Sequence, residues 1–188
     1  IELGCAVVQV QHVRADTVEE LAVMRNHHQH ARILEQPLFE PEHGIEIEMG
    51  QGAKPGTGGL LMGMKVSKRV DELRSLPMGV DQRSTVRHPD FLGADDLQVK
   101  IEELREATNY KVPIFVKMGA TRPRFDVAIA AKAGADVIVV DGAEGGTGAS
   151  PELLINHTGI PTMTAIRAAR EALEDCGMAD QVSLVAAG

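Results

Sequence analysis

The sequence predicts an α/β fold: a (β/α)8 barrel of the TIM type that is incomplete in this chain. Short apolar segments rich in Val, Ile and Ala alternate with amphipathic helical segments, a pattern typical of parallel sheets. Polar, glycine-rich or charged segments follow three of the apolar ones. About six βα units fit the 188 residues, whereas a closed barrel has eight in roughly 250 residues. We therefore expect one partial barrel domain over residues 1–188, without the first and last strands.

Six short segments are expected to form the strands: four are apolar runs bounded by turn or polar residues, residues 45–48 alternate apolar and acidic residues, and residues 79–84 give only a weak pattern. In chain order they are residues 5–10, 45–48, 79–84, 112–117, 135–140 and 182–187. Residues 135–140 (ADVIVV) give the clearest strand and residues 79–84 the weakest. A doubly wound open sheet is the alternative, but its glycine-rich fingerprint should follow the first strand, where Gln11, His12 and Val13 stand instead.

Five helices are expected between these strands, each marked by a capping residue or a helix-ending residue. They begin near Thr17, Ser67, Asp95, Asp126 and Thr162. Apolar residues recur in them at helical spacing: Val70, Leu73 and Leu76; Leu97, Ile101 and Leu104; Ala165, Ile166, Ala169 and Leu173. Gly134 and Gly177 are expected to end the last two helices.

Composition narrows the function classes. Hydrophobic residues make up 44% of the chain and aromatic residues only 3%, so the core must be aliphatic, which suits parallel strands buried on both faces. The net charge of −8 without a Lys/Arg cluster argues against nucleic-acid binding. No apolar run approaches the about 20 residues of a membrane span, and no signal-peptide pattern opens the chain. Two distant cysteines, Cys5 and Cys176, predict no disulfide framework and a cytoplasmic location.

Three segments that begin where a predicted strand ends are candidates for the functional site. They are the first segment (residues 50–59), the second segment (residues 117–124) and the third segment (residues 141–151). All strand C-termini of a parallel barrel lie on one rim, where active sites sit, so the segments are expected to converge on one pocket. Glycines in the first and third segments allow the backbone to approach a flat ring or a phosphate closely, with a flexible turn as the alternative.

Three cations in or near these segments are candidates for binding roles. Lys117 closes a predicted buried strand, so its stem can deliver the ammonium either to a bound cofactor ring or simply to water. Lys54 is flanked by Pro55 in a rigid part of the first segment and is poised for a carboxylate or keto oxygen. Arg74, on the following helix, can pair with a dicarboxylate, and a solvated helix charge is the alternative.

The histidines do not predict a metal site. His27, His28 and His30 lie in one predicted helix, but only His27 and His30 share a face, and no carboxylate completes a ligand set. His88 lies in a polar turn, where it can act as a proton donor or simply shape the turn.

GQGAKPGTGG (residues 50–59), followed by MGMKVS, and DGAEGGTGASP (residues 141–151) resemble the two signatures of the FMN domain of the glutamate synthase large subunit. IFVKMGA (residues 114–120) and residues 159–172 resemble the same family. The resemblance extends over about residues 45–188, and the first forty residues resemble the family poorly. Two long motifs in order are far more specific than a lone glycine-rich run.

The resemblance implies an FMN-dependent oxidoreductase of nitrogen metabolism and glutamate biosynthesis. Ammonia condenses with 2-oxoglutarate to 2-iminoglutarate, which reduced FMN converts to glutamate. Gln51 and Lys54 would act as catalytic residues that contact substrate and flavin, and Arg74 would bind a substrate carboxylate. The residues implied to hold the flavin are Lys117, Asp141, Gly145, Gly146, Thr147 and Gly148.

The family also implies partners that this sequence does not contain. An amidotransferase, an electron donor and an oligomeric assembly are expected in subunits or further domains. An iron–sulfur cluster is expected only in the complete protein, because its cysteine ligands are not in this chain. The last barrel strand, with its contribution to the phosphate site, is likewise expected outside residues 1–188.

One position departs from the family pattern and keeps other interpretations open. Glu48 stands three residues before Gln51, where the family usually has a lysine that helps to hold the dicarboxylate. A carboxylate there repels 2-oxoglutarate and suits a cationic amine, which favours the similar FMN subunit of N-methylglutamate synthase (methylamine–glutamate N-methyltransferase), acting on glutamate and methylamine. A non-catalytic barrel scaffold is the alternative from another class. A reduced-flavin isomerase is disfavoured, because that class lacks GAKPG.

Overall fold

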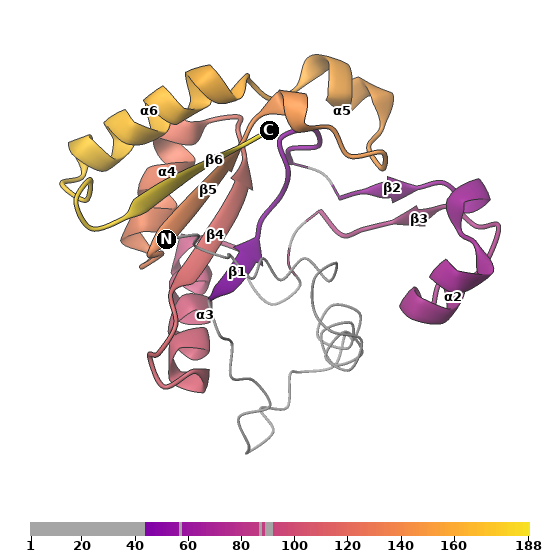
Figure 1. Cartoon of the computed structure of the whole chain (residues 1–188), viewed down its shortest axis with the longest axis horizontal. Coiled ribbons are helices and arrows are strands. Elements are labelled where there is room, and N and C mark those ends of the chain that lie inside the picture. The colour runs from indigo at the N-terminus through magenta and orange to yellow at the C-terminus, as the bar shows by residue number, and fades with distance from the viewer. Residues whose placement is uncertain (1–43, 57, 87, 89–91) are drawn as a thin grey trace, which may run out of the picture.

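The computed structural model describes residues 44–188 apart from residues 57, 87 and 89–91 (Figure 1). At its centre is a parallel sheet with the strand order β1–β4–β5–β6. The strands are β1 (Ile45–Glu48), β4 (Ile114–Gly119), β5 (Val137–Asp141) and β6 (Ser183–Ala187). The predicted α/β class and the strands expected at 45–48, 112–117, 135–140 and 182–187 are thus confirmed, with bounds shifted by up to two residues.

Three helices pack on one face of this sheet. They are α3 (Ala94–Ala107), α4 (Pro123–Lys132) and α6 (Thr162–Asp175). α4 connects β4 to β5, and α6 lies between β5 and β6, so each forms the crossover between neighbouring parallel strands. Residues from all three helices join the strands in a single buried cluster, which is the core of the described part of the chain.

The two faces of the sheet differ in chemistry, because successive residues of a strand point to opposite faces. Ile47, Val116 and Ile138 lie in register, and all three belong to the core beneath the helices. Glu48 and Lys117 lie in register one residue further on, so their side chains point to the opposite face. We call this second face, which carries charged residues, the polar face.

The amino ends of the central strands are tied to α3 by a polar cluster. Arg105 donates from Nη2 to the Gly134 carbonyl at 2.7 Å and to both carboxylate oxygens of Asp136 at 2.9 Å. Asp136 also accepts the backbone N–H of Ile114 at 2.8 Å. These hydrogen bonds therefore hold α3 against the amino edge of the sheet.

A second, antiparallel pair of strands leaves the sheet after β1. It consists of β2 (Leu60–Leu61) and β3 (Gln82–Arg83), with the 3₁₀ helix η1 (Gly63–Lys65) and α2 (Lys68–Arg74) between them. Figure 1 shows this β2–β3 extension (residues 60–83) reaching away from the parallel sheet.

The prediction of a barrel strand at residues 79–84 is therefore wrong. Gln82 and Arg83 pair antiparallel with Leu61 and Leu60 rather than joining the parallel sheet. Both residues are polar, so this short strand has no apolar side chain to bury between a sheet and a helix.

The helix predictions differ in outcome. Ser67 caps α2 through the N–H of Val70, but α2 buries no residue, and Leu73 is 57% exposed. In α3 the predicted inward residues Leu97 and Ile101 are buried, and α6 has the predicted bounds. The helix α5 (Glu152–His157) and the 3₁₀ helix η2 (Ala143–Gly145) were not predicted.

The remaining predictions fall on other parts of the chain. The strand at residues 5–10, the helix near Thr17, the histidines at residues 27, 28 and 30, and Cys5 lie outside the described residues. Within the described ranges, no helix combines the length and the apolar character that crossing a bilayer requires.

Candidate functional site

The three candidate segments start side by side at the carboxyl edge of the sheet. Backbone hydrogen bonds continue the ladder one residue beyond the strands and hold the segments in place. They run from Met49 N to Lys117 O, from Ala120 N to Asp141 O and from Gly142 N to Ala187 O, each at 2.8 Å. The strand ends therefore lie at one edge of the sheet, and convergence of the segments on one pocket stays a prediction.

The first and third segments touch through their backbones. A Cβ placed on Gly52 would lie 1.9 Å from the carbonyl oxygen of Gly142, so only glycine permits this contact. Similarly, a Cβ on Gly119 at the end of β4 would lie 2.6 Å from the carbonyl oxygen of Gln51. The first segment therefore lies directly on the ends of β4 and β5.

Two further hydrogen bonds join the third segment to the first segment and to Leu60, the residue that follows it. Ser150 donates from Oγ to the Ala53 carbonyl at 3.1 Å, and the N–H of Leu60 donates to the Ala149 carbonyl at 2.7 Å. The two glycine-rich segments thus form one connected surface at the carboxyl edge.

Lys54 belongs to this surface. A Cβ on Gly59 would lie 3.0 Å from Lys54 Nζ and 3.4 Å from the Ala149 carbonyl oxygen, so the ammonium lies over the end of its own segment, beside the third one. Lys54 and the third segment are therefore at the same edge of the sheet.

An ion pair occupies the polar face directly below this edge. Lys117 Nζ lies 3.7 Å from Asp141 Oδ2, and the two side chains are only 12% and 11% exposed. Glu48 lies in register with Lys117 on the same face. The polar face thus places a nearly buried cation among several carboxylates.

Glu46 shows the electrostatic consequence of that arrangement. Burial raises the pKa of its carboxyl group above the ordinary value, Lys117 opposes the rise, and Glu48 and Asp141 add to it. Burial and the neighbouring carboxyl groups of Glu48 and Asp141 thus disfavour a charge on Glu46, whereas Lys117 favours it.

Gln51 carries an unsatisfied acceptor. Within the described residues, its side-chain Oε1 is a buried oxygen without a hydrogen-bond partner. Leaving such a group unpaired costs about 1–3 kcal/mol. A ligand N–H donor would remove that cost, so the atom marks the carboxyl edge as a place for a ligand.

Two other predicted residues have different locations. Arg74 is the last residue of α2, at the outer part of the β2–β3 extension and away from the parallel sheet (Figure 1). The structure does not bring it to Gln51 and Lys54. His88, by contrast, lies with Nε2 2.8 Å from the carbonyl oxygen of Glu48, at the end of β1, where Nε2 acts as the donor.

The glycine-rich part of the third segment is held at both ends by side chains that were not assigned from the sequence. Gly146 and Gly148 have φ of 65° and 62°, in the left-handed region that favours glycine. Lys65 donates from Nζ to the Gly148 carbonyl at 2.7 Å. At the other end, Glu144 accepts the N–H of Thr162, the first residue of α6, at 3.0 Å.

Hydrogen bonds also explain the acidity of Glu144. Its own backbone N–H and that of Thr162 hold the pKa of the carboxyl group below its usual value. The carboxylate thus remains charged at the amino terminus of α6, where the helix dipole favours an anion.

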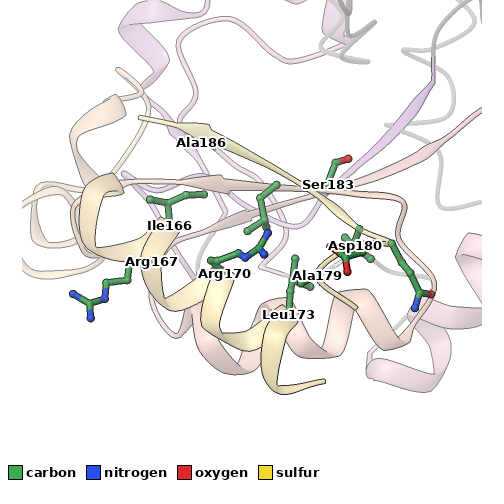
Figure 2. A pocket seen from close by; sticks show the side chains of 11 residues that line it. Ile166, Arg167, Arg170, Leu173, Ala179, Asp180, Ser183 and Ala186 are labelled. Atoms are coloured by element: carbon green, nitrogen blue, oxygen red, sulfur yellow. The ribbon is translucent and has the colours of Figure 1, made fainter. Parts of the chain in front are cut away.

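No predicted site residue lines the groove at the side of the sheet. Figure 2 shows this groove between α6 and β6, with Arg167, Arg170 and Asp180 among its lining residues. Within the described ranges, no group of three His, Cys, Asp or Glu side chains is arranged to hold a metal ion. The carboxyl edge remains the site where the predicted residues gather.

Comparison with known proteins adds an independent observation. Residues 34–188 match the family model described as the conserved region in glutamate synthase. The chain is 55% identical to a glutamate synthase large subunit-like protein of Rhizobium meliloti over 144 residues, which is 77% of this chain and 33% of that protein.

Two further relatives are more distant in sequence. An archaeal glutamate synthase (NADPH) of Methanocaldococcus jannaschii is 41% identical over 145 residues, 77% of this chain and 28% of that protein. The large chain of glutamate synthase (NADPH) of Bacillus subtilis is 41% identical over 141 residues, 74% of this chain and 9% of that protein. The chain thus spans about a third or less of the length of these curated relatives.

Proposed function

This chain belongs to the glutamate synthase family, and from that premise we propose that it is the FMN-binding part of a glutamate synthase-type oxidoreductase. The proposed reaction is the reduction of 2-iminoglutarate, formed from 2-oxoglutarate and ammonia, to glutamate. One observation carries the proposal: the first and third segments meet at the carboxyl edge, directly above the Lys117–Asp141 pair. The chain spans a third or less of the length of these relatives, and we propose the activity for the whole protein.

The sheet itself is proposed to be part of a (β/α)8 barrel. Parallel strands with helices on one face support this, because a barrel buries its strands between helices outside and side chains inside. The polar face would then be the barrel interior, with the candidate site at its carboxyl rim.

The residues at the carboxyl edge fit a flavin phosphate. The orphaned Oε1 of Gln51 is an acceptor that suits the ring N–H of the isoalloxazine. The backbone N–H groups of Gly146, Thr147 and Gly148, in a segment that carries no bulky side chain, suit the phosphate or the ring edge. Gly145, whose N–H donates to the Gly142 carbonyl, is proposed to contribute its unobstructed backbone surface to the flavin. When bound, FMN supplies the hydride of the reaction.

Lys117 and Asp141 are proposed to support the bound cofactor from the polar face, beneath the carboxyl edge. A nearly buried ammonium next to the ring favours negative charge on the reduced form. Asp141 keeps the Lys117 side chain at the edge through their ion pair.

Substrate binding is assigned to Gln51, Lys54 and Arg74. Lys54 is proposed as the catalytic cation that polarises the keto oxygen of 2-oxoglutarate or the imine nitrogen of 2-iminoglutarate, because its ammonium lies beside the third segment. Arg74 is proposed to bind a substrate carboxylate, which requires the β2–β3 extension to approach the carboxyl edge when substrate is present.

A flavin and activity assay on the whole protein tests the proposal. We expect a flavin absorbance band that is bleached by reductant, and glutamate formation from 2-oxoglutarate and ammonia. A protein that shows no bleachable band after incubation with FMN would contradict the proposal and favour a non-catalytic scaffold.

N-methylglutamate synthase is a second candidate function, favoured by the charges of the polar face. Glu48 lies in register with Lys117, and the carboxyl groups of Glu46 and Asp141 also interact with the Lys117 ammonium. Three carboxyl groups near the Lys117 ammonium repel a dicarboxylate substrate and attract a cationic amine.

Two substrate pairs separate the candidates. The purified complex is supplied with 2-oxoglutarate and ammonia, and separately with glutamate and methylamine. Glutamate synthase activity predicts turnover with the first pair, whereas turnover only with the second pair would replace it by N-methylglutamate synthesis.

The partners and location remain proposals of the same kind. We propose that an amidotransferase and an electron donor, in other subunits or domains, serve the site, and that an iron–sulfur cluster is bound outside residues 1–188. An oligomeric assembly and a cytoplasmic location are proposed with them.

A further inference from the structure

We propose that Lys65 is a positioning residue that holds the glycine-rich part of the third segment in its binding conformation. The inference rests on the proposed function, which assigns the backbone of Gly145, Gly146, Thr147 and Gly148 to the flavin. The carrying observation is the hydrogen bond of 2.7 Å from Lys65 Nζ to the Gly148 carbonyl oxygen.

The third segment needs such a contact because of its own sequence. Glycines lose more conformational freedom on folding than any other residue. Gly145, Gly146 and Gly148 are exposed, and two of them have left-handed φ values that other residues rarely adopt. Without fixed points on both sides, this stretch would sample many backbone conformations.

Each end of the stretch is fixed by a different element. Glu144 binds the N–H of Thr162 at the start of α6, so the amino end is tied to the core. The carboxyl end is tied to the β2–β3 extension, through Lys65 to Gly148 and through Leu60 to Ala149. Of these two contacts at the carboxyl end, the one from Lys65 is made by a side chain and the one from Leu60 by the backbone.

Lys65 is itself held in a defined position. It ends η1, whose first residue, Gly63, donates its N–H to Asp81 Oδ1 at 2.7 Å. The N–H of Lys65 donates to the Met62 carbonyl at 2.8 Å, and the next residue, Val66, is buried. The backbone that carries Lys65 is therefore rigid enough to position its partner.

The test compares Lys65→Met with Lys68→Met in the whole protein. Both variants remove one exposed lysine from the same region. Lys68 differs from Lys65 in its partner, because its Nζ lies 3.8 Å from Glu72 Oε1 in an ordinary surface ion pair within α2. Lys65→Arg keeps a donor at the position and serves as the rescue variant.

Three measurements are made on each variant: FMN affinity by fluorescence titration, hydrogen exchange of peptides that contain residues 145–148, and the melting temperature of the cofactor-free protein. Loss of one charge-assisted hydrogen bond predicts about five- to tenfold weaker FMN binding for Lys65→Met. Faster exchange at residues 145–148 should accompany it, with an unchanged melting temperature. Lys68→Met should match the wild type, and Lys65→Arg should recover part of the affinity.

The outcomes separate this inference from the proposed function. If the wild type binds FMN and Lys65→Met binds it as tightly as Lys68→Met, the positioning role is wrong and the proposed function stands. A lower melting temperature that accounts for the lost affinity would also overturn the positioning role. A wild-type protein that binds no FMN would remove both.

Discussion

Glu46 on β1 illustrates how the polar face sets the chemistry of a single residue. Its carboxyl pKa is raised, chiefly by burial, so the folded chain holds the proton more tightly than the unfolded chain does. The stabilising contribution of the protonated form is fully present below the ordinary pKa of 4.5 and is lost as the pH rises through the folded-state pKa. At neutral pH the charged carboxylate therefore opposes folding.

Replacing Glu46 by Gln should stabilise the protein near pH 7. We expect a gain of up to about 1 kcal/mol in the free energy of unfolding, discounted for the partial exposure of the group. The gain should disappear below pH 4, where the wild-type carboxyl is protonated. Urea denaturation at both pH values measures it, with Glu106→Gln on the exposed surface of α3 as the control. A gain of equal size in the control would refute the assignment to the polar face.

Lys54→Ala should abolish turnover while the fold remains intact. The ammonium is proposed to act at the carboxyl edge and is only half-buried, so its loss removes a functional charge with little loss of packing. For Lys54→Ala we expect kcat to fall at least about a hundredfold, with an unchanged circular dichroism spectrum. The control variant is Lys132→Ala, at the exposed end of α4, and it should leave kcat unchanged. Unchanged kinetics would remove Lys54 from the site.

The sequence was sufficient to bring three candidate residues toward one edge of the sheet, while their roles stay proposals. Gln51 lies three residues after β1, Lys117 lies in the carboxyl half of β4 rather than at its end, and Asp141 ends β5; parallel strands bring their carboxyl ends to one edge whatever the rest of the chain does. Lys65 and Glu144 were missed because their hydrogen bonds depend on how distant segments fold back. The motif that contains Lys65 was noted, but nothing in it identified Gly148 as the partner.

Among the elements, those with a buried apolar face were the most predictable. The pattern of α6 gave its bounds, and residues 135–140 gave β5 almost completely, because core packing fixes both. The strand expected at residues 79–84 was placed wrongly because its weak pattern, with the polar residues Gln82 and Arg83, does not identify the strand beside it. The pattern of α2 likewise repeats apolar residues, none of which is buried in the helix.

The contact between the first and third segments can be tested with two neighbouring glycines. Gly52→Ala should destabilise the protein by about 1–3 kcal/mol, because its Cβ would meet the Gly142 carbonyl at 1.9 Å. Gly50→Ala is the matched control, since a Cβ there has no neighbour within 4 Å. Urea midpoints of the two variants measure the difference, and equal midpoints would show that the segments can separate without cost.

At the scale of the whole molecule, the chain spans about a third or less of the length of the curated relatives it matches. The family resemblance implies that residues outside 1–188 contribute part of the phosphate site. Under the proposed function, the carboxyl edge then supplies only some of the contacts that a flavin phosphate requires. Barrel closure and partners stay proposals, because the four strands of the described parallel sheet fix neither.

A polypeptide of residues 1–188 should accordingly bind FMN weakly compared with the whole protein. We expect a Kd at least about tenfold higher, equivalent to the loss of one or two phosphate contacts. Fluorescence titration of both proteins under the same conditions measures the ratio. Nanomolar affinity of the shorter polypeptide would contradict the prediction.

The position of β1 beside β4 has a consequence for the order of folding. The sheet from β4 to β6 forms between neighbours in the chain, whereas β1 must be brought back across residues 49–113, which raises the contact order and the entropy of loop closure. We therefore expect β1 to join late, after the folding nucleus has formed around α4 and α6. Because Gln51 and Lys54 follow β1, nascent chains would acquire a stable sheet before they acquire affinity for a ligand.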